Sequence, residues 1–344
     1  MSGGVDSSVA AALLKKQGHD VTGVFFKPWS PDTKVAFCNW REDRQDAMRV
    51  CTKLGVPFKT WDFSKEYGKN VAKYMIEGYR AGITPNPDVM CNKEIKFGLF
   101  LRRALKEGAD YIATGHYIQI KRGKSNTLLL AKDPNKDQSY FLWTLTQKQL
   151  KHCLFPIGDY LKPDIRKLAK KFGLPNYDKK DSQGVCFVGQ LSMKDFLKKY
   201  IKPKTGHIIL EETGQNIGTH DGVYYYTIGQ RHGLDIKNGQ GPYFVIRKDT
   251  HRNLIYVAKG SLNKSLASKT AAIKNINWIA SRPQFPLTTG VKIRYRSTNV
   301  PAVINRDKSG RLSIKFKKPA RALTPGQSAV IYRGKEMLGG GIIE

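Results

Sequence analysis

A short turn that runs directly into a helix is the most constraining feature of this chain. Residues 2–7 read SGGVDS, and an apolar run follows at residues 9–14. Such a turn leaves backbone N–H groups free at the positive end of a helix dipole, where phosphates and other anions bind. An ordinary helix N-cap uses the same residue types. A P-loop is excluded, because this stretch lacks the G-x-x-x-x-G-K-[ST] pattern and its phosphate-binding lysine.

The alternation of elements up to residue 200 predicts an α/β fold with a doubly wound parallel sheet. Short β-branched or aromatic runs at 20–26, 57–63 and 109–117 alternate with helical patterns at 40–55 and 94–108 that end at glycine. The turn is expected at the carboxyl end of the first strand. Met1 directly precedes Ser2, so either the true start lies upstream or the sheet lacks that strand; we expect the former.

A change in composition and in the pattern of expected elements near residue 200 indicates further domains. Residues 201–268 are rich in glycine and threonine and predict a small, mostly β domain. From residue 269 onward, short strands alternate with turn residues, including a hairpin at 306–310, which is typical of a small β-barrel. We therefore expect three domains, with bounds at 1–200, 201–268 and 269–344.

The net charge points to a polyanionic partner. The chain has 59 Lys and Arg against 28 Asp and Glu, a formal charge of +31. This balance favours nucleic-acid binding over a generally basic composition. The chain has no run of eighteen apolar residues and no leader with a small-residue cleavage site, so we expect a cytoplasmic protein without a membrane span.

The cysteines point to individual reactive thiols. The five cysteines form no C-x-x-C pair, which disfavours a disulfide scaffold, a zinc ribbon or an iron–sulfur cluster; they are Cys38, Cys51, Cys91, Cys153 and Cys186. Cys51 and Cys153 lie in apolar-periodic segments and are expected to be buried, and Cys38 receives no role.

Two of these thiols lie in basic surroundings. Cys91 follows Asp88 at the entry to a predicted helix and precedes Lys93 and Lys96, which should favour the reactive thiolate. Cys186 lies in a polar segment after two lysines, at positions 179 and 180. Burial as a small hydrophobic residue is the alternative for either one.

The opening turn resembles the SGGxDS loop of the ATP pyrophosphatases, which hold a triphosphate and leave AMP on their substrate. With two activated thiols, such a loop favours replacement of oxygen by sulfur: a persulfide attacks the adenylated carbon, and a second cysteine breaks the sulfur bridge.

Eight stretches in family order resemble the bacterial tRNA-specific 2-thiouridylases over nearly the whole chain. They are SGGVDSS, NPDVMCNKEIKFG, ATGHY, KDQSYFLW, DSQGVCFVG, YTIGQRHGL, KIRYRS and LTPGQSAV. The resemblance implies an ATP-dependent enzyme that thiolates C2 of the wobble uridine of certain tRNAs, with AMP and pyrophosphate as products. It also implies a cysteine desulfurase or a sulfur-relay protein as sulfur donor. Mg²⁺ is expected with ATP, a dedicated metal cluster is not, and we expect a monomer.

The resemblance also implies roles for single residues. Cys186 is similar to the persulfide-bearing cysteine, Cys91 to its partner in a transient disulfide, and Asp88 to a general acid/base. The implied nucleotide site consists of Ser2, Gly3, Gly4, Val5, Asp6, Ser7, Gly115 and Phe26, the last in place of an expected methionine. The implied tRNA contacts are Asn86, Pro87, His116, Lys136, Asp137, Gln138, Arg294, Tyr295 and Gln327.

Two other functions stay open at this point. In another adenylating enzyme of the same superfamily, an amine would attack in place of the persulfide. A tRNA-binding protein could instead keep the loop as a nucleotide sensor without catalysis.

Overall fold

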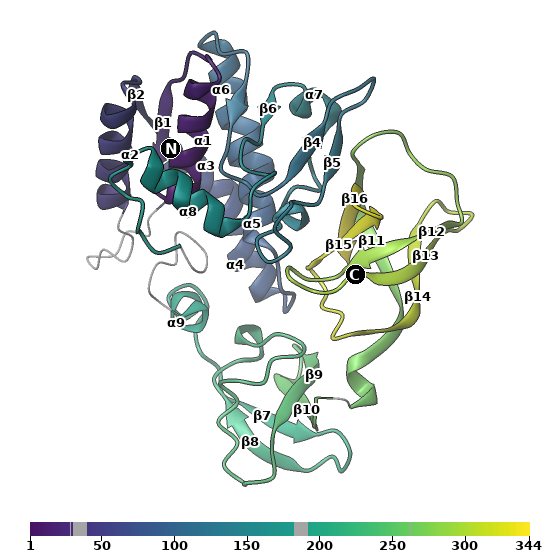
Figure 1. The fold of residues 1–344 in the computed structure, drawn as a ribbon. Helices are drawn as coiled ribbons and strands as arrows, with labels where there is room; N and C mark the ends of the chain where they lie inside the picture. Colours follow the sequence, from purple (N-terminus) through teal and green to yellow (C-terminus); the bar gives the residue numbers. More distant parts are fainter. Residues whose placement is uncertain (28, 30–39, 182–191, 262) are drawn as a thin grey trace.

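The computed structural model describes residues 1–27, 29, 40–181, 192–261 and 263–344 (Figure 1). Cys38 and Cys186 lie outside the described residues. Figure 1 shows a helix-rich N-terminal region, a small sheet below it and a barrel beside both. This order agrees with the α/β, middle β and C-terminal barrel organisation predicted from the sequence.

The N-terminal region contains two parallel strand pairs. Gly23 of β1 is in register with Phe58 of β2, and Ile112 of β3 with Cys153 of β6. Within the described residues, ladder hydrogen bonds do not join the two pairs into one sheet. The Met1 amino group lies beside the first pair and donates a hydrogen bond to the carbonyl oxygen of Val24 on β1 at 2.5 Å.

The strands of this region are β1 (Gly23–Lys27), β2 (Phe58–Asp62), β3 (Ile112–Ala113), β4 (Gln119–Lys121), β5 (Thr127–Leu129) and β6 (Cys153–Leu154). Its helices are α1 (Val5–Lys16), α2 (Trp40–Leu54), α3 (Ser64–Tyr67), η1 (Gly68–Ala72), α4 (Lys73–Arg80), α5 (Pro87–Met90), η2 (Cys91–Phe100), α6 (Leu101–Lys106), η3 (Ser139–Phe141), α7 (Gln147–Leu150) and α8 (Lys162–Lys171). After α2 and α6 the chain leaves the helix through Gly55 and Gly108, whose φ angles are +60° and +89°. These two helix ends confirm the expectation from the sequence.

The middle region forms a four-stranded sheet with the order β8-β7-β10-β9. Its elements are α9 (Met193–Lys198), β7 (Gly206–Leu210), β8 (Asn216–His220), η4 (Val223–Tyr225), β9 (Tyr243–Asp249) and β10 (Leu254–Lys259). Ile208, Val245 and Ile255 are fully buried and join the large core of the N-terminal region. The central pair β7–β10 is parallel, whereas the outer pairs are antiparallel.

The C-terminal strands close into a barrel. After the short helix η5 (Lys264–Leu266), the strands are β11 (Ala267–Trp278), β12 (Leu287–Lys292), β13 (Val300–Arg306), β14 (Leu312–Arg321), β15 (Ser328–Arg333) and β16 (Glu336–Ile343). Pairing of β11 with β16 closes the ring. Alternate residues of β14 point inward, since Leu312, Ile314 and Phe316 are buried and their neighbours are exposed. The hairpin expected at 306–310 joins β13 to β14.

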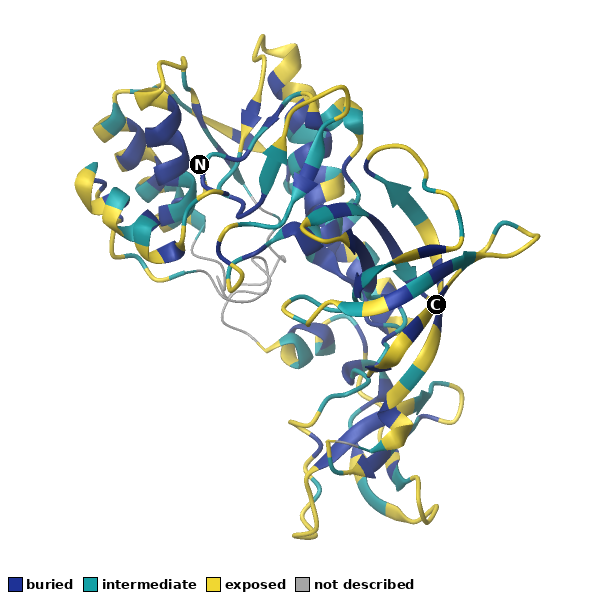
Figure 2. Cartoon of the chain, turned by 45° about the vertical axis from the view of Figure 1, so that its right-hand side comes forward, coloured by how far each residue is buried: buried dark blue, intermediate teal, exposed yellow. Residues whose placement is uncertain are grey.

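The barrel and the N-terminal region share a sheet and a core. The hairpin β4–β5 extends the barrel sheet, because Leu128 and Leu129 of β5 pair with Met337 and Glu336 of β16. The Trp143 indole N–H also donates to the Ser328 hydroxyl at 2.9 Å. Figure 2 shows buried residues through both regions, with exposed ones on the loops and on the outer sides of helices and strands.

Candidate active site

The turn at residues 2–7 has the strained backbone that its glycines allow. Gly3 has a φ of +76°, and a Cβ at this position would collide with the carbonyl oxygen of Asp43. Gly4 is the N-cap of α1 and offers no side-chain acceptor to the first turn of the helix. The Asn176 amide fixes the turn by donating to the Gly3 carbonyl at 2.8 Å and to the Ser8 hydroxyl at 3.0 Å. The arrangement is suited to an anion at the positive end of the helix dipole.

Gly115 lies directly against this turn; its expected role at the nucleotide stays a prediction. A Cβ on Gly115 would lie 2.7 Å from the backbone nitrogen of Ser7. Tyr117, two residues later, donates its hydroxyl to the carboxylate of Asp6 at 2.8 Å. Burial, together with the Asp6 charge, raises the pKa of Tyr117, so its hydroxyl stays protonated and donates.

A lysine that the sequence did not single out completes the surroundings of Asp6. The Lys162 ammonium lies 2.7 Å from Asp6 Oδ1 and 2.8 Å from Asp181 Oδ1. Its side chain is only 10% exposed. No local sequence motif indicated a role for Lys162 at this site. It lies 156 positions from Asp6 in the sequence, and only the fold brings the two side chains together.

Phe26, the expected adenine contact, is a partly buried residue of β1. Its ring packs against Phe63 with a centroid separation of 6.5 Å. An aromatic face on β1 can pack against a purine base. Its place at the adenine stays a prediction.

The segment of Asn86 to Cys91 begins a long helical run. The Asn86 side chain accepts a hydrogen bond from the Val89 amide at 3.2 Å, and Pro87 occupies the first helical turn. The run continues as the π-helical η2, a conformation often found at functional sites. Asp88 is partly buried; this burial raises the pKa of its carboxyl, and the charge of Lys96 lowers it.

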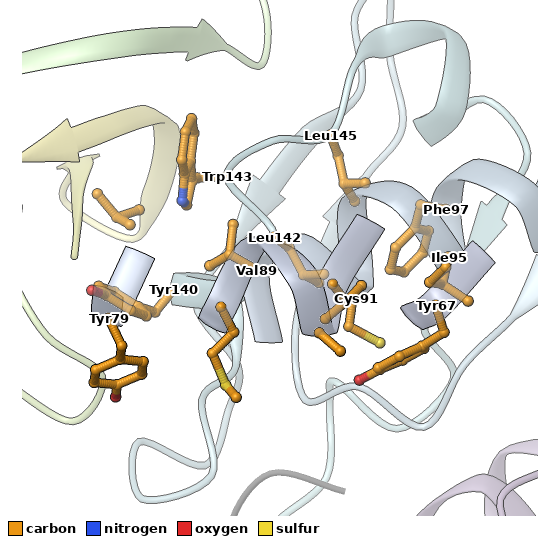
Figure 3. Packing of buried hydrophobic residues seen from close by; sticks show 14 of the residues in the cluster. Tyr67, Tyr79, Val89, Cys91, Ile95, Phe97, Tyr140, Leu142, Trp143 and Leu145 are labelled. Atoms are coloured by element: carbon orange, nitrogen blue, oxygen red, sulfur yellow. The ribbon is translucent and has the colours of Figure 1, made fainter. Parts of the chain in front are cut away.

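Cys91 lies on the core face of this helix, with an exposed fraction of 5% (Figure 3). Ile95, one turn later, and Leu142 belong to the same cluster of buried residues. Lys93 is exposed, and its ammonium lies 3.3 Å from the Glu94 carboxylate. Cys91 and Lys93 lie on different sides of the helix, as residues two apart do. The effect of the lysines on the Cys91 thiol stays a prediction. The disulfide with Cys186 stays a prediction, since Cys186 lies outside the described residues.

His116 is buried beside the same helix. Its Nδ1 lies 2.8 Å from the Thr114 hydroxyl, and its ring lies 5.8 Å from that of Phe97. Burial and the charge of Lys96 lower the pKa of His116 well below its usual value, so the ring is neutral near pH 7. Lys96 therefore acts electrostatically on both Asp88 and His116, a role that its sequence position did not reveal.

Residues 136–138, expected at tRNA, have contacts within the protein. Asp137 is buried and accepts hydrogen bonds from the Ser139 hydroxyl at 2.8 Å and the Lys292 ammonium at 3.1 Å. Gln138 accepts from the Tyr117 amide at 3.0 Å. The Lys136 ammonium lies 2.6 Å from Asp181. These contacts hold the loop between the N-terminal region and the barrel.

The expected tRNA contacts of the barrel lie at its junction with the other two regions. The Arg294 guanidinium donates to the carbonyls of Ile228 and Ala322, both at 2.7 Å, which links the middle region to the barrel. The Tyr295 ring packs 4.5 Å from that of Phe141. Gln327 donates to the carbonyls of Thr84 and Pro85, just before Asn86.

The structure thus brings the expected residues into two adjoining groups. The turn, Gly115 and Asp6 form one group, and the helix from Asn86 to Cys91, with His116, forms the other. Residues 115–117 connect them, because Gly115 and Tyr117 contact the turn while His116 lies beside Phe97 of η2. Among the described residues, no cluster of three or more His, Cys, Asp or Glu side chains could hold a metal ion.

Known protein families and known proteins match this chain over nearly its whole length. Family models describe a tRNA methyl transferase HUP domain at residues 1–190, a tRNA methyl transferase PRC-barrel domain at 194–259 and an aminomethyltransferase beta-barrel domain at 268–343. The tRNA-specific 2-thiouridylase MnmA of Geobacillus thermodenitrificans is 47% identical over 346 residues, which cover 100% of this chain and 93% of that protein. The chain belongs to the tRNA-specific 2-thiouridylase family.

Other members of the 2-thiouridylase family show the same extent of similarity. MnmA of Salmonella arizonae is 47% identical over 352 residues, covering 100% of this chain and 95% of that protein. MnmA of Lysinibacillus sphaericus is 45% identical over 349 residues, covering 100% and 92%. A solved NMN synthetase from Francisella tularensis covers 57% of this chain and 68% of its own at 17% identity, with a TM-score of 0.34, too weak a similarity to bear on fold or function. No helix in the described part of this 2-thiouridylase family member is long and apolar enough to cross a membrane.

Proposed function

We propose that this chain is a tRNA-specific 2-thiouridylase that uses ATP to replace the C2 oxygen of a wobble uridine by sulfur. The observation that carries the proposal is the 45–47% identity to 2-thiouridylases over the whole chain. The contact of Gly115 with the turn at residues 2–7, and the adjoining helix with Asp88 and Cys91, supports it.

ATP is the proposed co-substrate. The turn and the N-terminus of α1 would bind its phosphates, with Gly115 allowing close approach and Phe26 packing on adenine. The C2 oxygen of uridine attacks the α-phosphorus, so that AMP becomes attached to the base and pyrophosphate leaves. Mg²⁺ would enter with the ATP phosphates, since Mg²⁺ is usually bound through phosphates, water and one or two carboxylates.

Sulfur transfer would use the two cysteines. The terminal sulfur of a Cys186 persulfide attacks C2, and AMP leaves with the oxygen. The Cys91 thiolate then attacks the Cys186 sulfur, which breaks the sulfur–sulfur bond, leaves the transferred sulfur on C2 and forms a Cys91–Cys186 disulfide. A thiol reductant must reduce this disulfide before the next turnover. Loading of the persulfide requires an external donor, either a cysteine desulfurase or a relay protein.

Asp88 is the proposed general acid/base beside the target base. Burial raises the pKa of the Asp88 carboxyl toward neutral pH. A group whose pKa lies near the working pH can both accept and donate a proton. Neutral His116 can donate or accept a hydrogen bond nearby without adding charge. Asn86 and Pro87 would line the base pocket.

The tRNA is the proposed macromolecular substrate, bound in the cytoplasm by a monomer. A net charge of +31 favours contact with its phosphates. The wobble base must leave its stack to reach Asp88. Of the three proposed domains, 1–200, 201–268 and 269–344, the first and the last would contact the tRNA. We assign these contacts to His116, Lys136, Asp137, Gln138, Arg294, Tyr295 and Gln327.

Mass spectrometry of tRNA nucleosides tests the proposal. The chain is incubated with tRNA, ATP and a persulfide donor, beside Cys91→Ser, Cys186→Ser and the control Cys153→Ala, whose thiol is buried. We expect 2-thiouridine with wild type and the control and none with Cys186→Ser. Conversion of ATP to AMP and pyrophosphate that is undiminished in both cysteine variants, without 2-thiouridine from any chain, would favour an amine-type adenylating enzyme. Binding of tRNA without ATP consumption would favour a nucleotide-sensing binding protein.

A further inference from the structure

Three cationic side chains converge on one carboxylate beside the turn at residues 2–7. Asp181 lies 2.6 Å from the Lys136 ammonium, 2.8 Å from that of Lys162 and 3.0 Å from the Arg166 guanidinium. Burial of Asp181 raises its pKa, but hydrogen bonds from Lys136 and Lys162 lower it to about 2, so the carboxylate is ionised at neutral pH. A single anion therefore accepts three short, charge-assisted contacts.

This cluster adjoins the proposed phosphate site. Lys162 Nζ reaches Asp6 in the turn at 2.7 Å as well as Asp181. The Lys162 backbone N–H is bonded to Asp133 at 2.9 Å, and its side chain is nearly enclosed, so the ammonium has a defined position at the start of α8. Arg166 follows one helical turn later and points to the same carboxylate.

The chemistry of the cluster matches a ligand more anionic than a carboxylate. Phosphate oxygens accept the same lysine and arginine contacts, and a pyrophosphate group offers more of them and more negative charge than one aspartate. The turn itself has no lysine for the terminal phosphates of a nucleotide. Lys162 and Arg166 can supply that charge from α8, a part of the chain far away in sequence.

We infer that Lys162 and Arg166 bind the β- and γ-phosphates of ATP. When the phosphates are absent, the Asp181 carboxylate pairs with these two cationic side chains instead. The inference rests on the proposed use of ATP. Binding exchanges Asp181 for the phosphates, and after adenylation the returning carboxylate competes with the released pyrophosphate. Asp181 thus weakens the binding of a product that must leave.

Binding of inorganic pyrophosphate to the full-length chain, measured by isothermal titration calorimetry without tRNA, tests this inference. Lys162→Met should weaken pyrophosphate and ATP binding about tenfold or more, whereas Lys162→Arg should retain most of it. Asp181→Asn should strengthen pyrophosphate binding about tenfold, because the internal competitor is lost. The matched control is Lys167→Met, on the same helix but 81% exposed.

A thermal melt gives a second readout for the Asp181 variant. Without ligand, Asp181→Asn should melt below wild type, since three cations lose their shared anion, and pyrophosphate should raise its melting temperature more than that of wild type. Circular dichroism confirms that each variant is folded.

Each of the following results would overturn the inference. If Lys162→Met binds pyrophosphate and ATP like wild type while wild type makes 2-thiouridine, the inference fails and the proposed function stands. If Asp181→Asn binds pyrophosphate more weakly, Asp181 is no competitor. If Lys162→Met weakens only tRNA binding, the cluster serves RNA phosphates. A wild-type chain that binds neither ATP nor pyrophosphate contradicts both the inference and the proposed use of ATP.

Discussion

The side-chain amide of Gln327 donates a hydrogen bond to the carbonyl oxygen of Thr84 at 2.9 Å, which ties the barrel to the chain just before Asn86. The contact is reinforced by the Thr84 amide, which donates to the Pro325 carbonyl at 2.9 Å. The barrel therefore positions the start of the helix that carries Asp88 and Cys91. We therefore propose that Gln327 positions the proposed base pocket, in addition to its proposed contact with tRNA.

We expect Gln327→Glu, which keeps the shape but loses the donor, to lower the free energy of unfolding by about 1–2 kcal/mol. The catalytic rate with saturating tRNA should also fall, because the start of the helix from Pro87 loses two of its hydrogen bonds to the barrel. Denaturant unfolding and single-turnover thiolation measure the two effects. Weaker tRNA binding with an unchanged rate and stability would show that Gln327 contacts only tRNA.

The shared influence of Lys96 predicts a pH effect. Lys96→Met removes the charge that lowers the pKa values of Asp88 and His116, so both pKa values should rise. If ionised Asp88 is the base, the acidic limb of the single-turnover pH profile should move to higher pH. Lys93→Met, two residues away and exposed, is the control and should not shift it. Equal shifts in both variants would argue against a specific action of Lys96.

The close approach of Gly115 to the turn predicts a steric effect. Gly115→Ala places a methyl group 2.7 Å from the Ser7 nitrogen, which forces the turn to move. ATP affinity measured by equilibrium dialysis should fall about tenfold or more. Gly123→Ala, whose Cβ would lie 3.5 Å from its nearest neighbour, should bind ATP like wild type. Normal ATP binding by Gly115→Ala would remove Gly115 from the nucleotide site.

The buried pair Asp137–Lys292 predicts a stability effect. Lys292→Met leaves a carboxylate with a side-chain exposure of 5% without its cation and should cost about 3 kcal/mol of unfolding free energy. Lys274→Met, in an exposed pair with Glu344, should cost less than about 1 kcal/mol. Chemical denaturation compares the two. The double variant Asp137→Asn/Lys292→Met should be less destabilised than the sum of the single variants; simple additivity would deny the coupling.

Local features of the fold could be predicted because their signals lie within a few residues. The helix at 40–54 shows an apolar face and a closing glycine, and the barrel strand at 312–321 alternates inward and outward residues. Cys51 and Cys153 are buried as their apolar periodicity suggested, and burial raises the pKa of the Cys153 thiol to about 12.

Contacts between distant segments could not be predicted in this way. Lys162 reaches Asp6 only through the packing of α8 near α1, and the pairing of β5 with β16 joins segments whose sequences show no common pattern. The sequence also does not say which side of the helix each basic residue around Cys91 occupies. The structure places the thiol in the core and Lys93 outside.

Strand β16 pairs with three strands, β15, β11 and β5, and this has a consequence for how the chain folds during synthesis. The hairpin β4–β5 leaves the ribosome long before the strand with which it pairs. N-terminal domains generally fold first during translation, so the edge of β5 waits, unpaired, until Glu336 and Met337 emerge. A nascent chain halted within the barrel therefore exposes a strand edge open to wrong pairing, and a chaperone that shields it is most needed during that interval.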